Sequence, residues 1–295
     1  MFKGVGTALI TPFNLDQTVD LDSLKKIIQH QLENKIDALI VLGTTGESPV
    51  IEYDEGRKII TAVTEEATGK IPVIVGTGSN STKKVLENNK VAEDLKADGL
   101  LIVNPYYNKG TQDSLVEHYK EIANRTHLPI ILYNVPSRTG MNILPETVIK
   151  IHLQCPNVVA VKEASGDISQ IAKLISIKPD SLSVLSGNDD QTLPIMALGG
   201  DGVISVFSNP YPAQMKQITD AMLKDDLSSA QNYNNEYLGM MNSLFIETSP
   251  APVKYLMSKL GFCENVVRLP LVSASNKAKE IVDKEMDKLK VFASA

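Results

Sequence analysis

A lysine lies inside a stretch that otherwise has the composition of a buried β-strand, "VVAVKEASGD" at residues 158–167. Because strand side chains alternate between two faces, Lys162 is expected on the same face as Val158 and Ala160, with Val159 on the other. A lysine on an apolar face either extends along its stem to water or is placed for chemistry. In a dry core, lost solvation favours the neutral amine, which attacks a ketone to form a Schiff base. Lys162 is therefore a candidate nucleophile.

Three further polar residues lie in or directly after strand-like runs. Tyr133, in "YNVPSRTG" (133–140), is a candidate proton shuttle, since imine formation moves protons on and off oxygen. The alternative for Tyr133 is a core tyrosine whose hydroxyl is satisfied. Thr44 and Thr45, in "GTTGES" (43–48), either cap a helix or bind a substrate carboxylate with the amides of their glycine-rich loop.

These residues need a scaffold, and the chain shows a regular alternation of two element types. The strand-like runs, apolar on both faces as in a parallel sheet covered by helices, are residues 5–13, 37–45, 71–78, 98–105, 128–136, 157–165, 182–189 and 201–208. The amphipathic helical stretches are residues 21–33, 53–67, 81–96, 111–126, 145–152, 168–177, 191–198 and 212–223. Eight strands and eight helices within about 225 residues predict an α/β fold, a (β/α)₈ TIM barrel. A doubly wound open sheet is the alternative.

The pattern changes at about Asp226, after which no strand-like run follows. Helices are expected over residues 227–247, 250–260 and 274–290, separated by prolines. We therefore predict a barrel over residues 1–225 that carries the active site, and a C-terminal helical region over residues 226–295.

Composition excludes several classes of function. The 295 residues carry a net charge of −6, which offers nucleic acid no basic surface, and no apolar run reaches the roughly 18 residues of a membrane span. Two cysteines, Cys155 and Cys263, are too few for a disulfide framework and favour a cytoplasmic location. The four histidines lack ligand spacing and Asp189-Asp190 is interpreted as a pair of turn carboxylates, so no metal is expected.

Polar segments follow most of the strand-like runs, and in a barrel these segments meet at one end, where barrel enzymes carry out their chemistry. Four of them resemble, in order, the dihydrodipicolinate synthase / N-acetylneuraminate lyase family of pyruvate-dependent class I aldolases: "GTTGES" (43–48), "YNVPSRTG" (133–140), "VAVKEASG" (159–166) and "GNDD" (187–190). The resemblance runs from about Gly4 to at least Leu271 and includes "FIETSPAPVK" (245–254).

The resemblance implies a role for each matching residue. Lys162 matches the lysine that captures pyruvate as a Schiff base, and Tyr133 matches the general acid/base. Thr44 and Tyr107 match the rest of the proton relay, and in the family this tyrosine is lent across a subunit interface. The pyruvate pocket is matched by the carboxylate-binding Thr45, the main-chain contact Ile204 and the lining residue Gly187.

Arg138 separates the subfamilies. It matches the arginine with which the synthases bind the carboxylate of L-aspartate 4-semialdehyde, whereas the sialic acid lyases have no arginine there. A guanidinium suits a carboxylate better than a polyhydroxylated chain. An unspecialised surface arginine is the alternative.

The resemblance thus implies condensation of pyruvate with L-aspartate 4-semialdehyde to 4-hydroxy-tetrahydrodipicolinate, at the entry to diaminopimelate and lysine synthesis. No cofactor is expected, because the lysine itself is the electron sink. A homotetramer built as a dimer of dimers is implied as well. Two alternatives stay open: another aldolase of the superfamily that cleaves a sugar-derived 2-keto acid, and a barrel that has lost catalysis.

Some family members are inhibited by lysine at the subunit interface. The chain matches the regulated bacterial type at Ser48, Asn80 and Tyr106. It differs where that type has histidines and an acid, because Tyr53, Gly56 and Lys84 stand there. The ammonium of Lys84 would repel the amine of a lysine effector, so weak or absent inhibition is expected.

Overall fold

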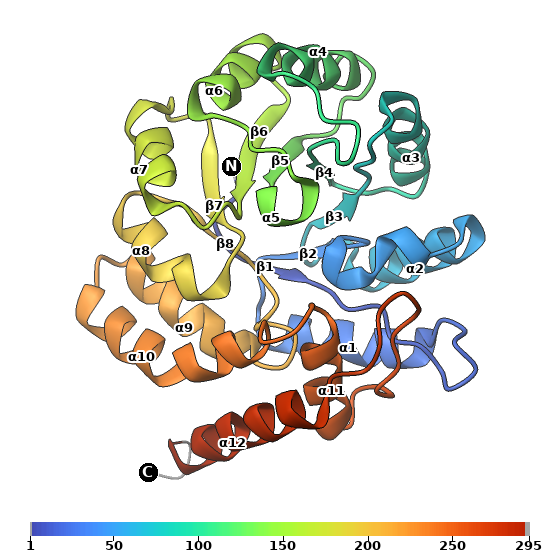
Figure 1. Ribbon diagram of the computed structural model, residues 1–295, viewed down its shortest axis with the longest axis vertical. Coiled ribbons are helices and arrows are strands. Elements are labelled where there is room, and N and C mark those ends of the chain that lie inside the picture. The colour runs from blue at the N-terminus through green and yellow to red at the C-terminus, as the bar shows by residue number, and fades with distance from the viewer. Residues whose placement is uncertain (1, 293–295) are drawn as a thin grey trace.

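The computed structural model describes residues 2–292, which form a closed barrel of eight parallel strands surrounded by helices (Figure 1). Each strand pairs with the next in sequence, and the eighth pairs with the first. The predicted (β/α)₈ barrel is confirmed, and the open sheet is excluded. The strands are β1 (Gly4–Ala8), β2 (Ala38–Val41), β3 (Val73–Gly76), β4 (Gly99–Val103), β5 (Ile130–Asn134), β6 (Val158–Glu163), β7 (Ser183–Ser186) and β8 (Gly202–Ser205).

The predicted helices are all present; four of them have the predicted bounds, and the ends of the others differ by a few residues. The barrel helices are α1 (Leu21–Glu33), α2 (Tyr53–Ala67), α3 (Thr82–Asp94), α4 (Gln112–Ala123), α6 (Pro145–Gln154), α7 (Ile168–Ile177), α8 (Thr192–Ala197) and α9 (Pro212–Leu223). Side chains cap α1 and α3: Asp20 accepts a hydrogen bond from the Ser23 amide, and Ser81 accepts one from the Lys84 amide.

Four short elements were not predicted, and they occupy the carboxyl ends of the strands, called here the rim. They are the helix α5 (Pro136–Thr139) and the 3₁₀ turns η1 (Thr44–Gly46), η2 (Ser48–Val50) and η3 (Asp189–Gln191). The predicted strand ranges were too long at the rim for the same reason: the chain leaves the sheet and turns there. A single turn is too short to show helical periodicity in sequence.

The apolar residues of the barrel form two layers, and a third, small cluster lies in the C-terminal region. Of the two layers, the larger lies between the strands and the helices that surround them, and the smaller fills the barrel interior. The interior residues are Ala8, Ala38, Ile40, Ile74, Leu101, Ile131, Tyr133, Val135, Ala160, Ala164, Leu185 and Ile204. Barrel closure requires a glycine at one point, because a Cβ on Gly202 would lie 2.0 Å from the Gly4 carbonyl oxygen.

The alternation predicted for β6 is partly wrong. The pairing with β5 shifts between Ile130 and Ile131, which face Val158 and Ala160, so Val159 is an extra residue in the ladder. Val158 therefore packs in the outer cluster, while Val159 packs against the interior one. From Ala160 onward the predicted faces hold, and Lys162 points into the barrel.

The C-terminal region consists of α10 (Leu227–Ser243), α11 (Ala251–Lys259) and α12 (Asn276–Phe292). In Figure 1 these helices lie outside α1 and α9 on one side of the barrel; α10 packs on α9, and α12 packs on α10 and α11. The predicted boundary between residues 225 and 226 stays a prediction. Residues 1 and 293–295, at the outer ends of the two predicted parts, lie outside the described residues. Between residues 2 and 292, no helix is long and apolar enough to cross a membrane.

Candidate active site

Lys162 and Tyr133 lie side by side inside the barrel at its rim. The two residues are direct partners across β5 and β6, and Lys162 Nζ lies 4.3 Å from the centroid of the Tyr133 ring. Lys162 is only 5% exposed, so its stem does not carry the amine to open water. The placement fits a buried amine with a phenol beside it rather than a surface lysine.

Thr44 and Thr45 form the first two residues of the turn η1, which connects β2 to the rim. Thr45 is buried, and Thr44 lines a cavity of about 270 Å³ that Tyr133 also lines. Amides in the first turn of a helix have no acceptor within it and are free to bind an anion. The turn therefore carries two hydroxyls and two amides, and through Thr44 it lines the same cavity as Tyr133.

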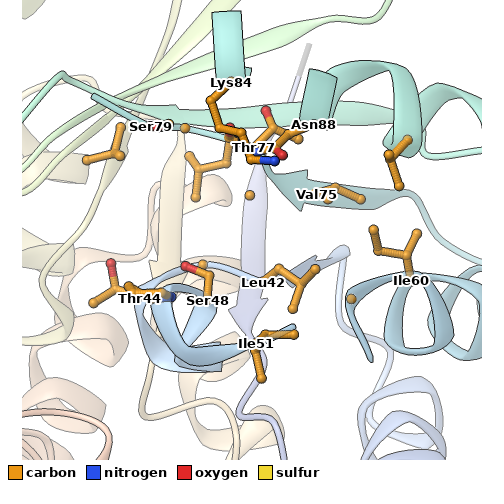
Figure 2. Close-up of a pocket in the computed structure, with 18 of the residues that line it drawn as sticks. Leu42, Thr44, Ser48, Ile51, Ile60, Val75, Thr77, Ser79, Lys84 and Asn88 are labelled. Carbon is orange, nitrogen blue, oxygen red and sulfur yellow. Dashed lines mark hydrogen bonds between the residues drawn. The ribbon is translucent and has the colours of Figure 1, made fainter. Parts of the chain in front are cut away.

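Figure 2 shows this cavity between two walls, with Thr44 and Ser48 on one side and Thr77, Ser79 and Lys84 on the other. The positions compared above with the lysine-regulated type mostly line the same cavity: Ser48, Tyr53, Gly56, Lys84 and Tyr106. Asn80 is not among the lining residues; its carbonyl accepts a hydrogen bond from Asn108. The cavity thus joins the barrel mouth to the proposed effector positions.

Gly187 and Ile204 complete the surroundings of the lysine. A Cβ on Gly187 would lie 3.1 Å from Lys162 Cε, so the backbone at Gly187 packs directly against the lysine stem. The Gly187 amide donates to the Glu163 carbonyl at 2.7 Å, which connects the ends of β6 and β7. Ile204, on β8, is fully buried in the interior cluster that contains Tyr133.

Two predicted residues lie apart from the lysine. Arg138 is exposed on α5, at the rim, and its Nη2 donates to the Ser249 carbonyl at 3.4 Å. Tyr107 is 92% exposed, with a backbone φ of +69°, and the cavity is lined by Tyr106 instead. Within one chain the structure therefore does not bring Tyr107 to the site.

Asp189 is a turn carboxylate as interpreted, the first residue of η3, but sequence reasoning did not predict its burial. It is 2% exposed, and its Oδ2 accepts hydrogen bonds from the amides of Val206 (3.1 Å) and Phe207 (2.9 Å). Burial raises the pKa of Asp189 to about 6, although hydrogen bonds and the positive charge of Lys162 oppose the rise. Its place in the "GNDD" motif was the only signal in the sequence.

A second missed group lies directly behind the Lys162–Tyr133 pair. Asn134 and Glu163, the next residue on each strand, are also direct partners, and Asn134 Nδ2 lies 3.1 Å from both Glu163 carboxylate oxygens. Glu163 also accepts from the Ser165 amide at 2.8 Å. Burial raises the pKa of Glu163. These bonds fix the strand ends that carry the lysine and the tyrosine.

The comparisons with known proteins agree with one another. Residues 1–289 match the profile of the dihydrodipicolinate synthetase family. A curated 4-hydroxy-tetrahydrodipicolinate synthase from Thermotoga sp. strain RQ2 is 49% identical over 285 residues, which cover 96% of this chain and 97% of the relative. The crystal structure of dihydrodipicolinate synthase from Thermotoga maritima has a TM-score of 0.96 at 47% identity, covering 99% of both chains. The Acinetobacter baumannii enzyme complexed with pyruvate has a TM-score of 0.96 at 36% identity, covering 99% of this chain and 100% of that one.

Proposed function

We propose a residue-level mechanism for this chain, which belongs to the dihydrodipicolinate synthetase family. The chain has 4-hydroxy-tetrahydrodipicolinate synthase activity, a Schiff-base lyase reaction of the class I aldolase type, as in the relatives that are 46–49% identical to it. A sugar-acid aldolase and a non-catalytic barrel are not favoured by these relatives. The observation that carries the mechanism is the buried Lys162 amine 4.3 Å from the Tyr133 ring centroid.

The first half of the reaction forms an enamine. The neutral amine of Lys162 attacks the ketone carbon of pyruvate, and loss of water leaves a protonated imine. Tyr133 supplies and removes the protons on the departing oxygen, with Thr44 as the next relay member. Loss of a methyl proton then converts the imine to an enamine, for which the iminium nitrogen is the electron sink.

The second half builds the product. The enamine carbon forms a bond to the aldehyde carbon of L-aspartate 4-semialdehyde, and the aldehyde oxygen takes up a proton. The substrate's amine then attacks the carbon that is bound to Lys162, closes the ring and displaces the lysine. The product leaves as 4-hydroxy-tetrahydrodipicolinate, and Lys162 is regenerated as the free amine.

Substrate carboxylates are held at two places. Thr45, together with the free amides of η1, binds the pyruvate carboxylate, while Ile204 contributes its main chain and Gly187 leaves room beside the lysine. Arg138, at the rim, binds the carboxylate of the aldehyde substrate. A guanidinium there makes paired, charge-assisted hydrogen bonds to a carboxylate.

The subunit arrangement and location follow from the resemblance and the surface. We assign a homotetramer in which Tyr107 of one subunit completes the proton relay of its neighbour. An aromatic side chain that is 92% exposed in the single chain, on a backbone with positive φ, supports this use. The free thiols of Cys155 and Cys263 support a cytoplasmic location.

Lysine inhibition is proposed to be weak or absent. Lys84 and Arg57 both line the cavity that contains the effector positions, and Glu52 is the one carboxylate among the described residues that line it, so an incoming lysine ammonium meets a net positive charge. Titration of the activity with lysine measures this directly, and strong inhibition at or below millimolar lysine would contradict the proposal.

Reduction with borohydride in the presence of pyruvate, followed by peptide mass mapping, tests the mechanism. We expect a reduced pyruvyl adduct on Lys162, no adduct in Lys162→Ala, and none on Lys254, which is also buried. An unmodified Lys162 in the wild-type protein, or an equal yield of adduct in Lys162→Ala, would refute the mechanism.

A further inference from the structure

An ion pair outside the proposed catalytic residues is completely buried at the rim. Lys254 Nζ lies 2.5 Å from Glu47 Oε1, and the two side chains are 0% and 1% exposed. Glu47 follows Thr45 by two residues in the "GTTGES" segment, whereas Lys254 belongs to α11 in the C-terminal region. The pair therefore joins the turn that carries Thr44 and Thr45 to a helix about 200 residues away in sequence.

The Glu47 side of the pair belongs to the turn itself. The Glu47 amide donates to the Thr44 carbonyl at 3.0 Å, and its own carbonyl accepts from Val50 at 3.0 Å. Its backbone is left-handed, with a φ of 55° and a ψ of 34°. Residues other than glycine rarely adopt this conformation and need surrounding contacts to hold them in it. A change at the Glu47 side chain thus acts directly on the backbone of Thr44 and Thr45.

On the C-terminal side of the pair, Lys254 and the segment after α11 make several contacts that hold them in place. Lys254 Nζ also donates to the Val266 carbonyl at 2.8 Å and lies 3.9 Å from the centroid of the Phe13 ring. The segment after α11 adds a second link, because the Arg268 amide donates to Glu47 Oε2 at 3.0 Å. The Arg268 guanidinium donates to the Val50 carbonyl at 2.8 Å, at the end of the next turn, η2.

The rest of this segment fastens the contact to the barrel. Both Nη atoms of Arg268 lie 2.6 Å from the Glu55 carboxylate, at the start of α2. Its guanidinium lies over the Phe13 ring, with Cζ 4.3 Å from the centroid. In Figure 1 the loop between α11 and α12 reaches the side of the barrel where α2 begins. Lys254 and Arg268 therefore hold the turn from outside, at a fixed distance from the barrel wall.

Charge makes the two partners mutually dependent. A buried ammonium or carboxylate without its counter-ion is strongly unfavourable, so each partner requires the other in place. Burial lowers the pKa of Lys254, and the Glu47 carboxylate opposes this effect. The Thr11 hydroxyl is a further anchor for the turn, since it donates to the Gly46 carbonyl at 2.7 Å. The turn is thus fixed by Thr11 from the barrel side and by Lys254 from the C-terminal side.

We propose that Glu47 and Lys254 are positioning residues for catalysis: their buried ion pair lets the C-terminal region hold Thr44 and Thr45 in the geometry that binds the pyruvate carboxylate. This inference rests on the proposed function and gives the C-terminal region a part in it. The same region also contacts Arg138 through the Ser249 carbonyl, two residues before α11 begins.

The test uses the full chain and three variants, Glu47→Gln, Lys254→Met and the double variant, with Lys216→Met as a matched control. Lys216 forms a part-buried ion pair with Asp37 at 2.9 Å, at the amino end of β2 and so at the opposite end of the barrel. Melting temperature, kcat and KM for pyruvate, and the rate of borohydride trapping of Lys162 are measured for each, well below melting.

We expect a KM for pyruvate raised by roughly 10- to 100-fold in both single variants, with a smaller change in kcat, because the lost geometry serves carboxylate binding. Lys216→Met is expected to lose stability and keep the wild-type KM. In the double variant no buried charge is left unpaired, so stability recovers while KM stays raised.

Each result has a definite meaning. Single variants that keep the wild-type KM, or a double variant that regains it, would overturn the positioning role even if stability changes. If a single variant does not fold, the double variant decides the question alone. Failure of the wild-type protein itself to form the Lys162 adduct refutes the proposed function instead, so the two failures are distinguishable.

Discussion

Gly187→Ala is expected to disturb Lys162 more than any single methyl group added elsewhere at the rim. The new Cβ would lie 2.6 Å from Ala164 Cβ and 3.1 Å from both the Glu163 carbonyl oxygen and Lys162 Cε. Ordinary contact begins at 3.4 Å, so the Ala164 contact must open by about 0.8 Å. Ala164 follows Lys162 by two residues at the end of β6, so opening this contact displaces the strand end that carries the lysine, in addition to the direct contact with its stem.

The magnitude follows from that displacement. A shift of about 1 Å in a reacting group can reduce a rate by roughly 100-fold, so a fall of about 10- to 100-fold in kcat/KM and in borohydride trapping is expected. Overpacking of this kind also costs about 1–3 kcal/mol of stability. A loss of activity therefore needs to be separated from a loss of folded protein.

Gly200→Ala provides that separation. A Cβ there would lie 2.6 Å from Ile195 Cγ2 and 2.8 Å from the Ile195 carbonyl oxygen, an equally severe clash at the amino end of β8, far from the rim. Both variants are compared by thermal melting and by trapping with pyruvate and borohydride. The reasoning is refuted if Gly187→Ala traps pyruvate at the wild-type rate, or if Gly200→Ala loses trapping to the same degree.

Three further changes have expected outcomes of their own. Tyr133→Phe should lower kcat by roughly 10²- to 10⁴-fold, the usual contribution of a general acid/base, and steady-state kinetics would contradict this by showing a smaller effect. Arg138→Met should raise KM for L-aspartate 4-semialdehyde by roughly 10- to 100-fold and leave KM for pyruvate unchanged; an effect on pyruvate instead would move Arg138 to the other subsite. Asp189 has a folded pKa of about 6, above its ordinary value of 3.8, so its contribution to stability is full below about pH 4 and is lost as pH rises through 6. Relative to wild type, Asp189→Asn should therefore gain about 2 kcal/mol between pH 4 and pH 7 in urea unfolding, and a difference independent of pH would rule this out.

Local pattern predicted the features that depend on neighbours in sequence. The strand alternation placed Lys162 in the interior, and the helix periods placed α1, α2, α7 and α9 correctly, because periodicity is a property of the segment itself. The bulge at Val159 was missed because it arises from pairing with β5 rather than from β6 alone. The turn η1 was missed because a single turn has no period.

Burial of charge was the feature that sequence reasoning handled worst. Asp189 has the sequence surroundings of a turn residue. Its carboxylate is covered only in the folded chain, where Val206 and Phe207, directly after β8, donate their amides to it. The Glu47 carboxylate pairs with the ammonium of Lys254 on α11, in a part of the chain that no local pattern connects to "GTTGES". Tyr107 is a different case, since the partner that would cover it is another subunit.

Among the side chains that the structure describes, two lysines are buried, and they show what decides between a nucleophile and a structural cation. Lys162 and Lys254 each lie over an aromatic ring, with Nζ 4.3 Å and 3.9 Å from the centroid. Lys254 has a carboxylate at 2.5 Å and a carbonyl at 2.8 Å, which stabilise its ammonium form. Within residues 2–292, no carboxylate oxygen lies within 4.0 Å of Lys162 Nζ. Because Lys254 is held by these two partners and Lys162 is not, Lys162 is the one of the two buried amines that is placed to meet a ketone, and the difference lies in partners that the fold supplies.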